Sequence, residues 1–410
     1  MLKNFFKGDK VIWIIFLLFC MVSIIEVFSA SSTLTFRSGD HWAPITNHFS
    51  LLFGGAVFVW IVHIIPCRFF WTGVALLPIS WALLVIVLVM SVAVNGANRW
   101  IDLGFIQFQP SELAKMALII VVAKILAIFQ GKDGVADGEA LKWIGIVTLP
   151  TVALIGVENL STAAILIVTV FLMMFIGHVP RRQMFALTSL GVGGIILALF
   201  LAVAVPNSVW NSVGLHRIET WKARIERFGG EKVPPAKYNV SDNQQVAHAN
   251  IAIATSHLWG KGPGNSVERD SLPQAFSDFI YAIVIEELGL IGGAFVAFLY
   301  IFLMMRAGKI ARWCNNPFYS YLVTGICILI ATQAMFNMMV AVGIMPVTGQ
   351  PLPLISKGGS STLINCAFIG IILSISHYVY EKRRQEEAEQ QPAEAPQLPN
   401  PDRKEAAPKA

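Results

Sequence analysis

Charged residues are scarce in this sequence. Asp, Glu, Lys and Arg make up 13% of the 410 residues, whereas 55% are hydrophobic and the mean hydropathy is +0.65. A soluble globular chain carries about 25% charged residues. The low content excludes a chain of two or three soluble domains, which the length alone would allow, and it indicates that lipid surrounds most of the protein.

Cysteine and histidine patterns that carry chemistry are also missing. The five cysteines lie in or beside apolar runs, and none lies in the long polar segment 207–277, so the sequence implies no disulfide framework. No histidines have HxxxH or HxH spacing, so we expect no histidine-based metal site. The basic residues form no stripe interleaved with aromatic side chains, which argues against a nucleic-acid partner.

Long apolar runs are abundant instead. A membrane-spanning helix needs roughly 20 mostly apolar residues. Runs of this kind lie at 11–30, 50–66, 70–94, 113–130, 142–157, 161–178, 184–206, 279–305, 320–343 and 361–380. We therefore predict an all-α integral membrane protein of about ten transmembrane helices. A large extracytoplasmic loop is expected between the seventh and the eighth helix.

The short loops alternate in charge, which predicts the orientation. Every second loop is basic, and these loops contain Lys3, Lys7, Lys10, Arg68, Lys132, Lys142, Arg181, Arg182, Arg306, Lys309, Arg312, Lys382, Arg383 and Arg384. The positive-inside rule places these loops and both termini in the cytoplasm. The predicted organisation is a cytoplasmic N-terminus at 1–10, seven helices in 11–206, an extracytoplasmic loop at 207–277, three helices in 278–380 and a disordered cytoplasmic tail at 381–410.

The first polar stretch on the predicted outer side is NGANRWIDLGFIQFQPSELAK, residues 95–115. Pro110 suits the first position of a helix, and Glu112 has two interpretations, as a cap of that helix or as a functional group. Lys115 lies inside an apolar run, where a charge needs a partner or a water-filled cavity. Glu112 is the nearest candidate partner, because it lies three residues earlier on the same helix face.

The large loop carries two basic features. Arg217 and Arg224, with Lys222 and Arg227, have the spacing of an amphipathic helix, and the spacing favours a helix that lies among lipid headgroups. Lys261 lies between two glycines in GKGPGNS, a pattern in which backbone amides and one ammonium can approach a phosphate. Gly-rich turns are common, so this pattern alone is a weak signal.

Carboxylates cluster where the loop meets the next apolar run. Asp278 lies at this junction beside Phe279, and partial desolvation there raises the proton affinity of a carboxylate, which suits a general base. The alternative is an aspartate stabilised by the helix dipole. Glu286 and Glu287 lie about two turns further on, and at least one of them should face a cavity or a cation.

The last stretch is GIMPVTGQPLPLISKGGSST, just before the final apolar run. Its three prolines prevent a regular helix, and irregular backbone near a membrane is tolerated only inside protein or along a wet cavity. Lys357 and Ser360 flank the two glycines that open the next helix, where free amides favour an anion. Ser360 can cap this helix at the same time. The outer side thus suits a substrate with a phosphate-bearing lipid tail, whose headgroup these residues do not identify.

With these motifs the chain resembles the shape, elongation, division and sporulation (SEDS) family, which contains FtsW, RodA and SpoVE. The resemblance spans roughly residues 10–380 and rests on RWIDLG, FQPSELAK, GKGPGNS, SDFIYAIVIEELGLIG and GQPLPLISKGGSS in this order. It implies a peptidoglycan glycosyltransferase of the bacterial inner membrane that polymerises lipid II at the outer face. GKGPGNS is more similar to the division branch, FtsW, than to the rod-shape branch.

The resemblance also implies roles for residues and partners. Asp278 matches the family's essential acidic residue, and we expect it to deprotonate the acceptor hydroxyl. The cations expected to stabilise the undecaprenyl pyrophosphate leaving group are Arg217, Arg224, Lys261 and Lys357, with Ser360 as a further ligand. Arg99, Glu112, Lys115 and Glu286 are expected to be structural or to line the cavity. A divalent cation, Mg or Mn, is plausible at the pyrophosphate, although the sequence shows no dedicated metal cage.

The expected protein partners are a class B penicillin-binding protein, which is a transpeptidase, and other divisome membrane proteins. Two rival functions are a lipid II flippase and a non-catalytic divisome scaffold. The chain departs from the family pattern at Gln274, Phe276-Ser277, Glu158-Asn159-Leu160-Ser161, His248 and Lys357. Asp278, Lys115 and Glu286, in contrast, follow the family pattern.

Overall fold

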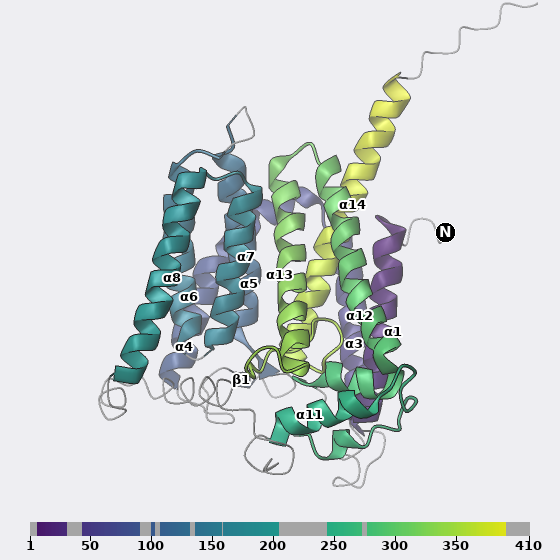
Figure 1. The fold of residues 1–410 in the computed structure, drawn as a ribbon. Helices are drawn as coiled ribbons and strands as arrows, with labels where there is room; N and C mark the ends of the chain where they lie inside the picture. Colours follow the sequence, from purple (N-terminus) through teal and green to yellow (C-terminus); the bar gives the residue numbers. More distant parts are fainter. Residues whose placement is uncertain are drawn as a thin grey trace, which may run out of the picture.

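The computed structural model describes residues 6–30, 43–90, 100–102, 107–131, 136–157, 159–204, 244–272 and 277–390. Within them the fold is a bundle of long helices with one two-stranded antiparallel sheet (Figure 1). The helices are α1 (Lys10–Ala30), α3 (Ala43–Ile64), α4 (Leu76–Met90), α5 (Pro110–Ile128), α6 (Glu139–Gly156), α7 (Leu160–Ile176), α8 (Arg181–Ala204), α11 (Gln244–Thr255), α12 (Ile280–Trp313), α13 (Pro317–Ala341) and α14 (Gly359–Gln390). The 3₁₀ helices are η2 (Cys67–Ala75) and η4 (Glu268–Asp270), and the strands are β1 (Ile101–Asp102) and β2 (Gln107–Phe108).

A helix lies in each of the ten predicted apolar runs, which confirms the all-helical membrane class. Six helical segments of the described residues are long and apolar enough to cross a membrane, and two shorter apolar helices, His48–Ile64 and Leu160–Ile176, accompany them. The six are Lys10–Ser29, Cys67–Val89, Glu139–Gly156, Ile280–Trp313, Pro317–Ala341 and Gly359–Glu389. The number of spans, ten, stays a prediction. Strands β1 and β2 were not expected from the sequence.

Helix α13 occupies a central position in the bundle. It packs against α12 on one side and against α5 and α7 on the other, while α14 packs along α3 (Figure 1). Its buried residues are distributed all round the helix, as expected for a span enclosed by other helices. Asn316 caps its start by accepting a hydrogen bond from the Phe318 amide (2.9 Å), and Pro317 follows at a position that needs no donor.

The start of α1 and the end of α14 lie at the same end of the bundle (Figure 1). Asp9, which is buried, accepts hydrogen bonds from the Arg306 Nε and the Tyr380 hydroxyl, both at 2.7 Å. These contacts join the start of α1 to α12 and α14. A common end for the start of α1 and the end of α14 agrees with the predicted topology, whereas the assignment of that end to the cytoplasm stays a prediction.

Helix α14 is longer than its apolar run. It continues to Gln390, so the prediction of a disordered tail is wrong for residues 381–390. Its last ten residues, EKRRQEEAEQ, are good helix formers with charges of both signs, and a helix already nucleated in the bundle extends readily through them. The remainder of the predicted tail, 391–410, lies outside the described residues.

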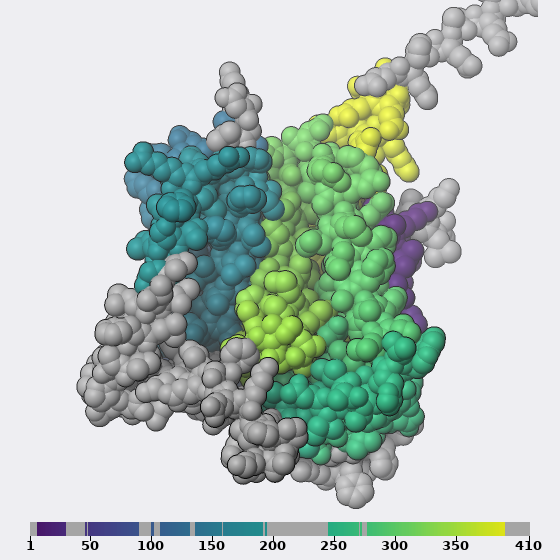
Figure 2. Space-filling view, viewed as in Figure 1, coloured from purple at the N-terminus to yellow at the C-terminus, as the bar shows by residue number. Residues whose placement is uncertain are grey.

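The opposite end of the bundle carries the polar segments that the sequence placed outside. Figure 2 shows residues from α11 to the start of α12 spread over this end, beneath the long helices. Helix α11 packs against α12 and η4, and more lightly against α13. The irregular segment between α13 and α14, residues 342–358, lies at the same end (Figure 1). This end therefore brings together most of the candidate residues that the structure describes.

Candidate functional site

Asp278 lies two residues before the start of α12 and is half-buried. Its Oδ1 accepts a hydrogen bond from the Ser277 hydroxyl (2.9 Å). A Cβ atom on Gly349 would be 3.5 Å from Asp278 Oδ2, so the carboxylate lies against the irregular 342–358 segment. Two stretches that are about 70 residues apart in the chain thus meet at the predicted catalytic residue.

Asn337 of α13 joins Asp278 to this segment. Its side-chain Nδ2 donates to the backbone carbonyl of Asp278 (2.9 Å) and to that of Gln350 (2.7 Å). A second link is Ser356, whose hydroxyl donates to the Ser277 carbonyl (2.6 Å). Because prolines leave this segment without regular backbone pairing, buried side chains satisfy its carbonyl groups instead. The position of Asp278 is therefore fixed from α13 and from the segment itself.

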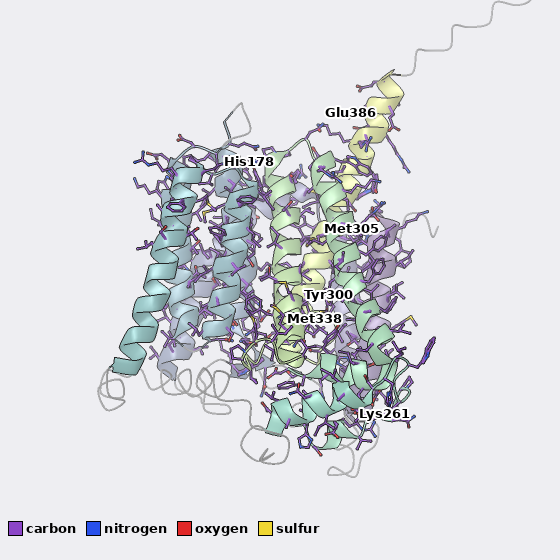
Figure 3. The ribbon with its side chains drawn as sticks, in the orientation of Figure 1. His178, Lys261, Tyr300, Met305, Met338 and Glu386 are labelled. Atoms are coloured by element: carbon purple, nitrogen blue, oxygen red, sulfur yellow. The ribbon has the colours of Figure 1, made fainter. Side chains whose placement is uncertain are left out.

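The segment is also held from its other sides. Gln350 donates to the Thr162 hydroxyl at the start of α7 (3.0 Å), and Gln333 of α13 donates to the Pro351 carbonyl (3.1 Å). The Tyr300 hydroxyl of α12 donates to the Pro353 carbonyl in the interior of the bundle (Figure 3). Interior helices thus give an irregular backbone a defined conformation.

Lys115 and Glu112 form the buried ion pair that the sequence predicted. The Lys115 Nζ is 2.8 Å from Glu112 Oε1, and it also donates to Gln333 Oε1 (3.2 Å). Their side chains are only 2% and 5% exposed. Since Gln333 also binds the Pro351 carbonyl, the pair connects α5 to the segment beside Asp278. The helix-cap interpretation of Glu112 finds no support, because the backbone amide of the N-cap residue, Gln109, donates to the Ser360 hydroxyl instead.

Ser360 and Lys357 lie at the start of α14. The Ser360 hydroxyl is buried and accepts a hydrogen bond from the Gln109 amide (3.0 Å), which joins α14 to the start of α5. Lys357 is half-buried, and this burial lowers the pKa of its ammonium group. Their predicted contacts with substrate stay predictions, but the structure gives Ser360 a structural partner that the sequence did not reveal.

The GKGPGNS segment contacts carboxylates of α12. Lys261 Nζ is 2.6 Å from Glu286 Oε1, and the same oxygen accepts from the Val267 amide (3.1 Å). The Ser266 hydroxyl donates to the other oxygen of Glu286. Figure 3 shows Lys261 at the end of the bundle that carries α11, far from Glu386 at the end of α14. The expectation that at least one of the two glutamates faces a cavity or a cation is confirmed for Glu286, and the anion beside Lys261 is a carboxylate.

Glu287 holds the next part of the same segment. Its carboxylate accepts from the Gly264 amide (2.9 Å), from the Ser266 amide (3.3 Å) and from the Ser29 hydroxyl of α1. The Arg269 guanidinium is 4.0 Å from it and donates to the Gly264 carbonyl (2.8 Å). Both glutamates are fully buried. They fold residues 261–269 onto α12, whereas Asp278 lies at the edge of the bundle with partial access.

Three predicted site residues, Arg99, Arg217 and Arg224, lie outside the described residues, as do the departures at Glu158, Gln274 and Phe276. His248, another departure, is described, and its Nδ1 is 2.5 Å from Glu268 Oε2. In the described part of the chain, no group of three His, Cys, Asp or Glu side chains is placed to hold a metal ion. The divalent cation therefore stays a prediction.

The sequence analysis missed the amides of α13. Gln333 and Asn337 are four residues apart, so they lie on one face of an apolar helix and both point toward the 342–358 segment. Their spacing within a spanning run was a usable signal, because polar groups inside a membrane need partners. Residue spacing could not predict their partners, which are backbone carbonyl groups of Gln350 and Pro351.

Fold and site together define a polytopic helical membrane protein with a polar site at one end of its bundle. Residues 9–381 match the family of FtsW, RodA and SpoVE, which is described as "Cell cycle protein". The chain belongs to this family, which confirms the resemblance drawn from its motifs.

Similar proteins include three named probable peptidoglycan glycosyltransferase FtsW. The one from Escherichia coli O6:H1 is 33% identical over 73% of this chain and 68% of its own length. The Coxiella burnetii protein is 30% identical over 87% and 92%, and the Bacillus subtilis protein is 30% identical over 92% and 93%.

Two solved structures share the fold. A chain from a structure titled "Structural coordination of polymerization and crosslinking by a peptidoglycan synthase complex" superposes with a TM-score of 0.70 at 25% identity, covering 91% of this chain and 99% of that one. Thermus thermophilus RodA, a rod shape determining protein, superposes with a TM-score of 0.62 at 23% identity, covering 92% and 99%.

Proposed function

We propose that this protein is a peptidoglycan glycosyltransferase that polymerises lipid II into β-1,4-linked glycan during septal cell-wall synthesis. Its relatives carry this activity in their names, and the match extends over nearly the whole chain. The observation that carries the proposal is the placement of Asp278, a half-buried carboxylate held between α12 and the 342–358 segment. The protein would lie in the bacterial inner membrane with both termini cytoplasmic.

The proposed reaction is an inverting displacement. The C4 hydroxyl oxygen of the acceptor attacks the anomeric carbon of the growing lipid-linked glycan, and the bond from that carbon to the pyrophosphate breaks. Asp278 accepts the hydroxyl proton, a role typically worth about 10²–10⁴-fold in rate. The undecaprenyl pyrophosphate leaves with the electron pair, and cations near it stabilise the transition state more than the ground state.

Lys357 and Lys261 are the described candidates for these cations, and Arg217 and Arg224 are the others. Lys357 lies two residues before the start of α14, where helix amides also favour an anion. Lys261 already neutralises Glu286, so a role at the pyrophosphate requires it to contact both anions. A divalent cation bound to the pyrophosphate would supply further charge without a protein cage.

Two buried polar atoms near Asp278 support substrate binding there. Asn337 Oδ1 and Thr348 Oγ1 have no hydrogen-bond partner among the described residues. Asn337 itself binds the Asp278 carbonyl, and Thr348 precedes Gly349, which borders the carboxylate. Buried polar atoms without partners are rare in proteins, and a bound ligand or water commonly satisfies them. Sugar hydroxyl groups would provide such partners.

The proposed protein partner is a class B penicillin-binding protein, within an assembly of other divisome membrane proteins. The structure that superposes with the higher TM-score carries a title describing a synthase complex that coordinates polymerization with crosslinking. A transpeptidase partner would use the nascent strands at the outer face, where Asp278 is proposed to act.

The rival functions predict different behaviour. A flippase would move lipid II across vesicles without making polymer, and its sites usually lie near the membrane midplane. The described polar candidates other than the Glu112–Lys115 pair instead lie in or beside the segments at one end of the bundle. A non-catalytic scaffold would tolerate loss of the Asp278 carboxylate.

The test is glycan polymerisation from purified lipid II by the protein with its cognate transpeptidase. Asp278→Asn should abolish polymer, while expression and membrane insertion remain normal. The matched control is Asp137→Asn, the same change at an exposed aspartate beyond the other end of α5. Full polymerisation by Asp278→Asn would refute the assignment. Precursor translocation without polymer from wild-type protein would favour the flippase.

A further inference from the structure

The turn that precedes Lys261 exposes two large apolar side chains. Leu258 is 59% exposed and Trp259 is 80% exposed, the highest value among the large hydrophobic residues described. Both lie outside the candidate membrane spans. Side chains of this size are unfavourable in water, so their exposure calls for a second surface.

The position of this turn relative to the bilayer can be judged from α1 and α12, which pack against each other. At one end Asp9 binds Arg306, and at the other Ser29 binds Glu287. Asp9 and Ser29 are 20 residues apart along α1, which is about 30 Å at 1.5 Å per residue. Glu287 and Arg306 are 19 residues apart along α12, whose kink at Gly289 lies close to Glu287. The hydrocarbon core of a bilayer is about 30 Å thick. With Asp9 and Arg306 at the inner boundary of the core, as the proposed orientation requires, Glu287 would lie near the outer boundary.

The turn lies directly on α12 at this boundary. The Leu290 amide donates to the His257 carbonyl (3.2 Å), and the Ile291 amide donates to the Leu258 carbonyl (3.4 Å). The side chains of Leu290 and Ile291 are 49% and 47% exposed on a candidate span. The apolar surface of the turn is thus continuous with the part of α12 that faces lipid.

We propose that Leu258 and Trp259 insert into the headgroup and upper acyl region of the outer leaflet. Tryptophan is enriched at this level of membrane proteins, because its ring is apolar and its N–H is polar. The partner is the lipid bilayer itself, which provides a third support, beside α1 and α12, for the segment containing Lys261. The proposal rests on the orientation proposed above but not on the glycosyltransferase reaction.

Spin labels test this placement in liposomes of phosphatidylglycerol and phosphatidylethanolamine. Trp259→Cys would be labelled after the partly exposed Cys20 and Cys314 are replaced by serine. Labels at Phe298→Cys, on the lipid-facing part of α12, and at Asn265→Cys, an exposed polar position of the same segment, give the lipid and water references. The measurement compares collisions with oxygen, which partitions into lipid, and with a water-soluble nickel chelate.

The label at 259 should collide more with oxygen and less with nickel than the label at 265, approaching the label at 298. Equal nickel accessibility at 259 and 265 would overturn the proposal. So would protection at 259 that develops only when the transpeptidase is added, because the turn would then be a protein-binding surface. If Trp259→Cys fails to fold, brominated phospholipids should quench wild-type tryptophan fluorescence more than that of Trp259→Phe, and equal quenching would refute the insertion. Neither readout depends on polymerisation.

Discussion

At the scale of single residues, Lys115 shows what a buried charge requires. Its ammonium is held between Glu112 and Gln333, and the side chain is almost inaccessible. Removing one member of a buried ion pair typically costs about 3–5 kcal/mol, because the other charge remains buried without compensation. Glu112→Gln should therefore lower the thermal unfolding midpoint of the purified protein markedly, and so should Lys115→Met.

The double variant, Glu112→Gln with Lys115→Met, should lose less stability than the sum of the two single variants. Replacing both charges leaves no unpaired ion, and apolar replacement of a whole buried pair is often neutral. A double-mutant cycle on unfolding midpoints measures this coupling. Strict additivity of the two single losses would show that the two side chains contribute to stability independently of each other, contrary to the contact in the structure.

At the scale of elements, the junction of α12 with the 256–262 segment depends on two glycines with positive φ. Gly289 has φ 74° and ψ −178° inside α12, and a Cβ there would be 2.2 Å from the Leu258 carbonyl oxygen. Gly260 has φ 74°, and a Cβ on it would be 2.2 Å from the Glu287 carbonyl oxygen. The helix kink and the turn therefore approach closely only because neither residue has a side chain.

Gly289→Ala should detach this segment from α12. Hydrogen exchange of the amides of Gly264 and Val267, which bind the two buried glutamates, should accelerate, and polymerisation should fall. Gly308→Ala is the matched control, because Gly308 lies in the same helix with open space around it. That change should be neutral or stabilise the protein by up to about 1 kcal/mol. Unchanged exchange in Gly289→Ala would contradict the close approach.

The sequence predicted the elements well, because apolar runs and breaker residues are local signals. The first run, 11–30, and α1 agree to within one residue. The end of α14 was misjudged, since charged residues suggested a solvated tail when they also favour a helix. The β1–β2 pair was missed because two-residue strands carry no periodicity.

At the scale of the whole molecule, the sequence identified groups but not their long-range partners. The Lys115–Glu112 contact was predictable because three residues separate the pair on one helix. By contrast, Lys261 binds Glu286 across 25 residues, and Asn337 binds the Asp278 carbonyl across 59. Such contacts depend on how helices pack, which residue spacing does not specify. The GKGPGNS segment, which the sequence predicted could approach a phosphate, therefore binds carboxylates of its own chain.

The Arg306–Asp9 ion pair should stabilise the bundle at the end far from the candidate site. Arg306 binds buried Asp9, and the two connect α1, α12 and α14 at the end opposite Asp278. Arg306→Gln leaves the Asp9 carboxylate with the Tyr380 hydroxyl and helix amides alone. Because the Arg306 side chain is 25% exposed, solvent screening reduces the cost to about 1–3 kcal/mol, between the surface and buried cases.

The unfolding midpoint of Arg306→Gln in detergent should therefore fall, whereas Arg312→Gln, at an exposed position of the same helix end, should leave it unchanged. Polymerisation per folded molecule should stay near the wild-type rate at low temperature, since Arg306 and Glu287 are 19 residues apart along α12 and Asp278 lies beyond Glu287. A rate loss without a stability loss would instead indicate that the Asp9 contact couples to the site. The two ends of the bundle would then be linked by a conformational change of α12, rather than by its rigidity.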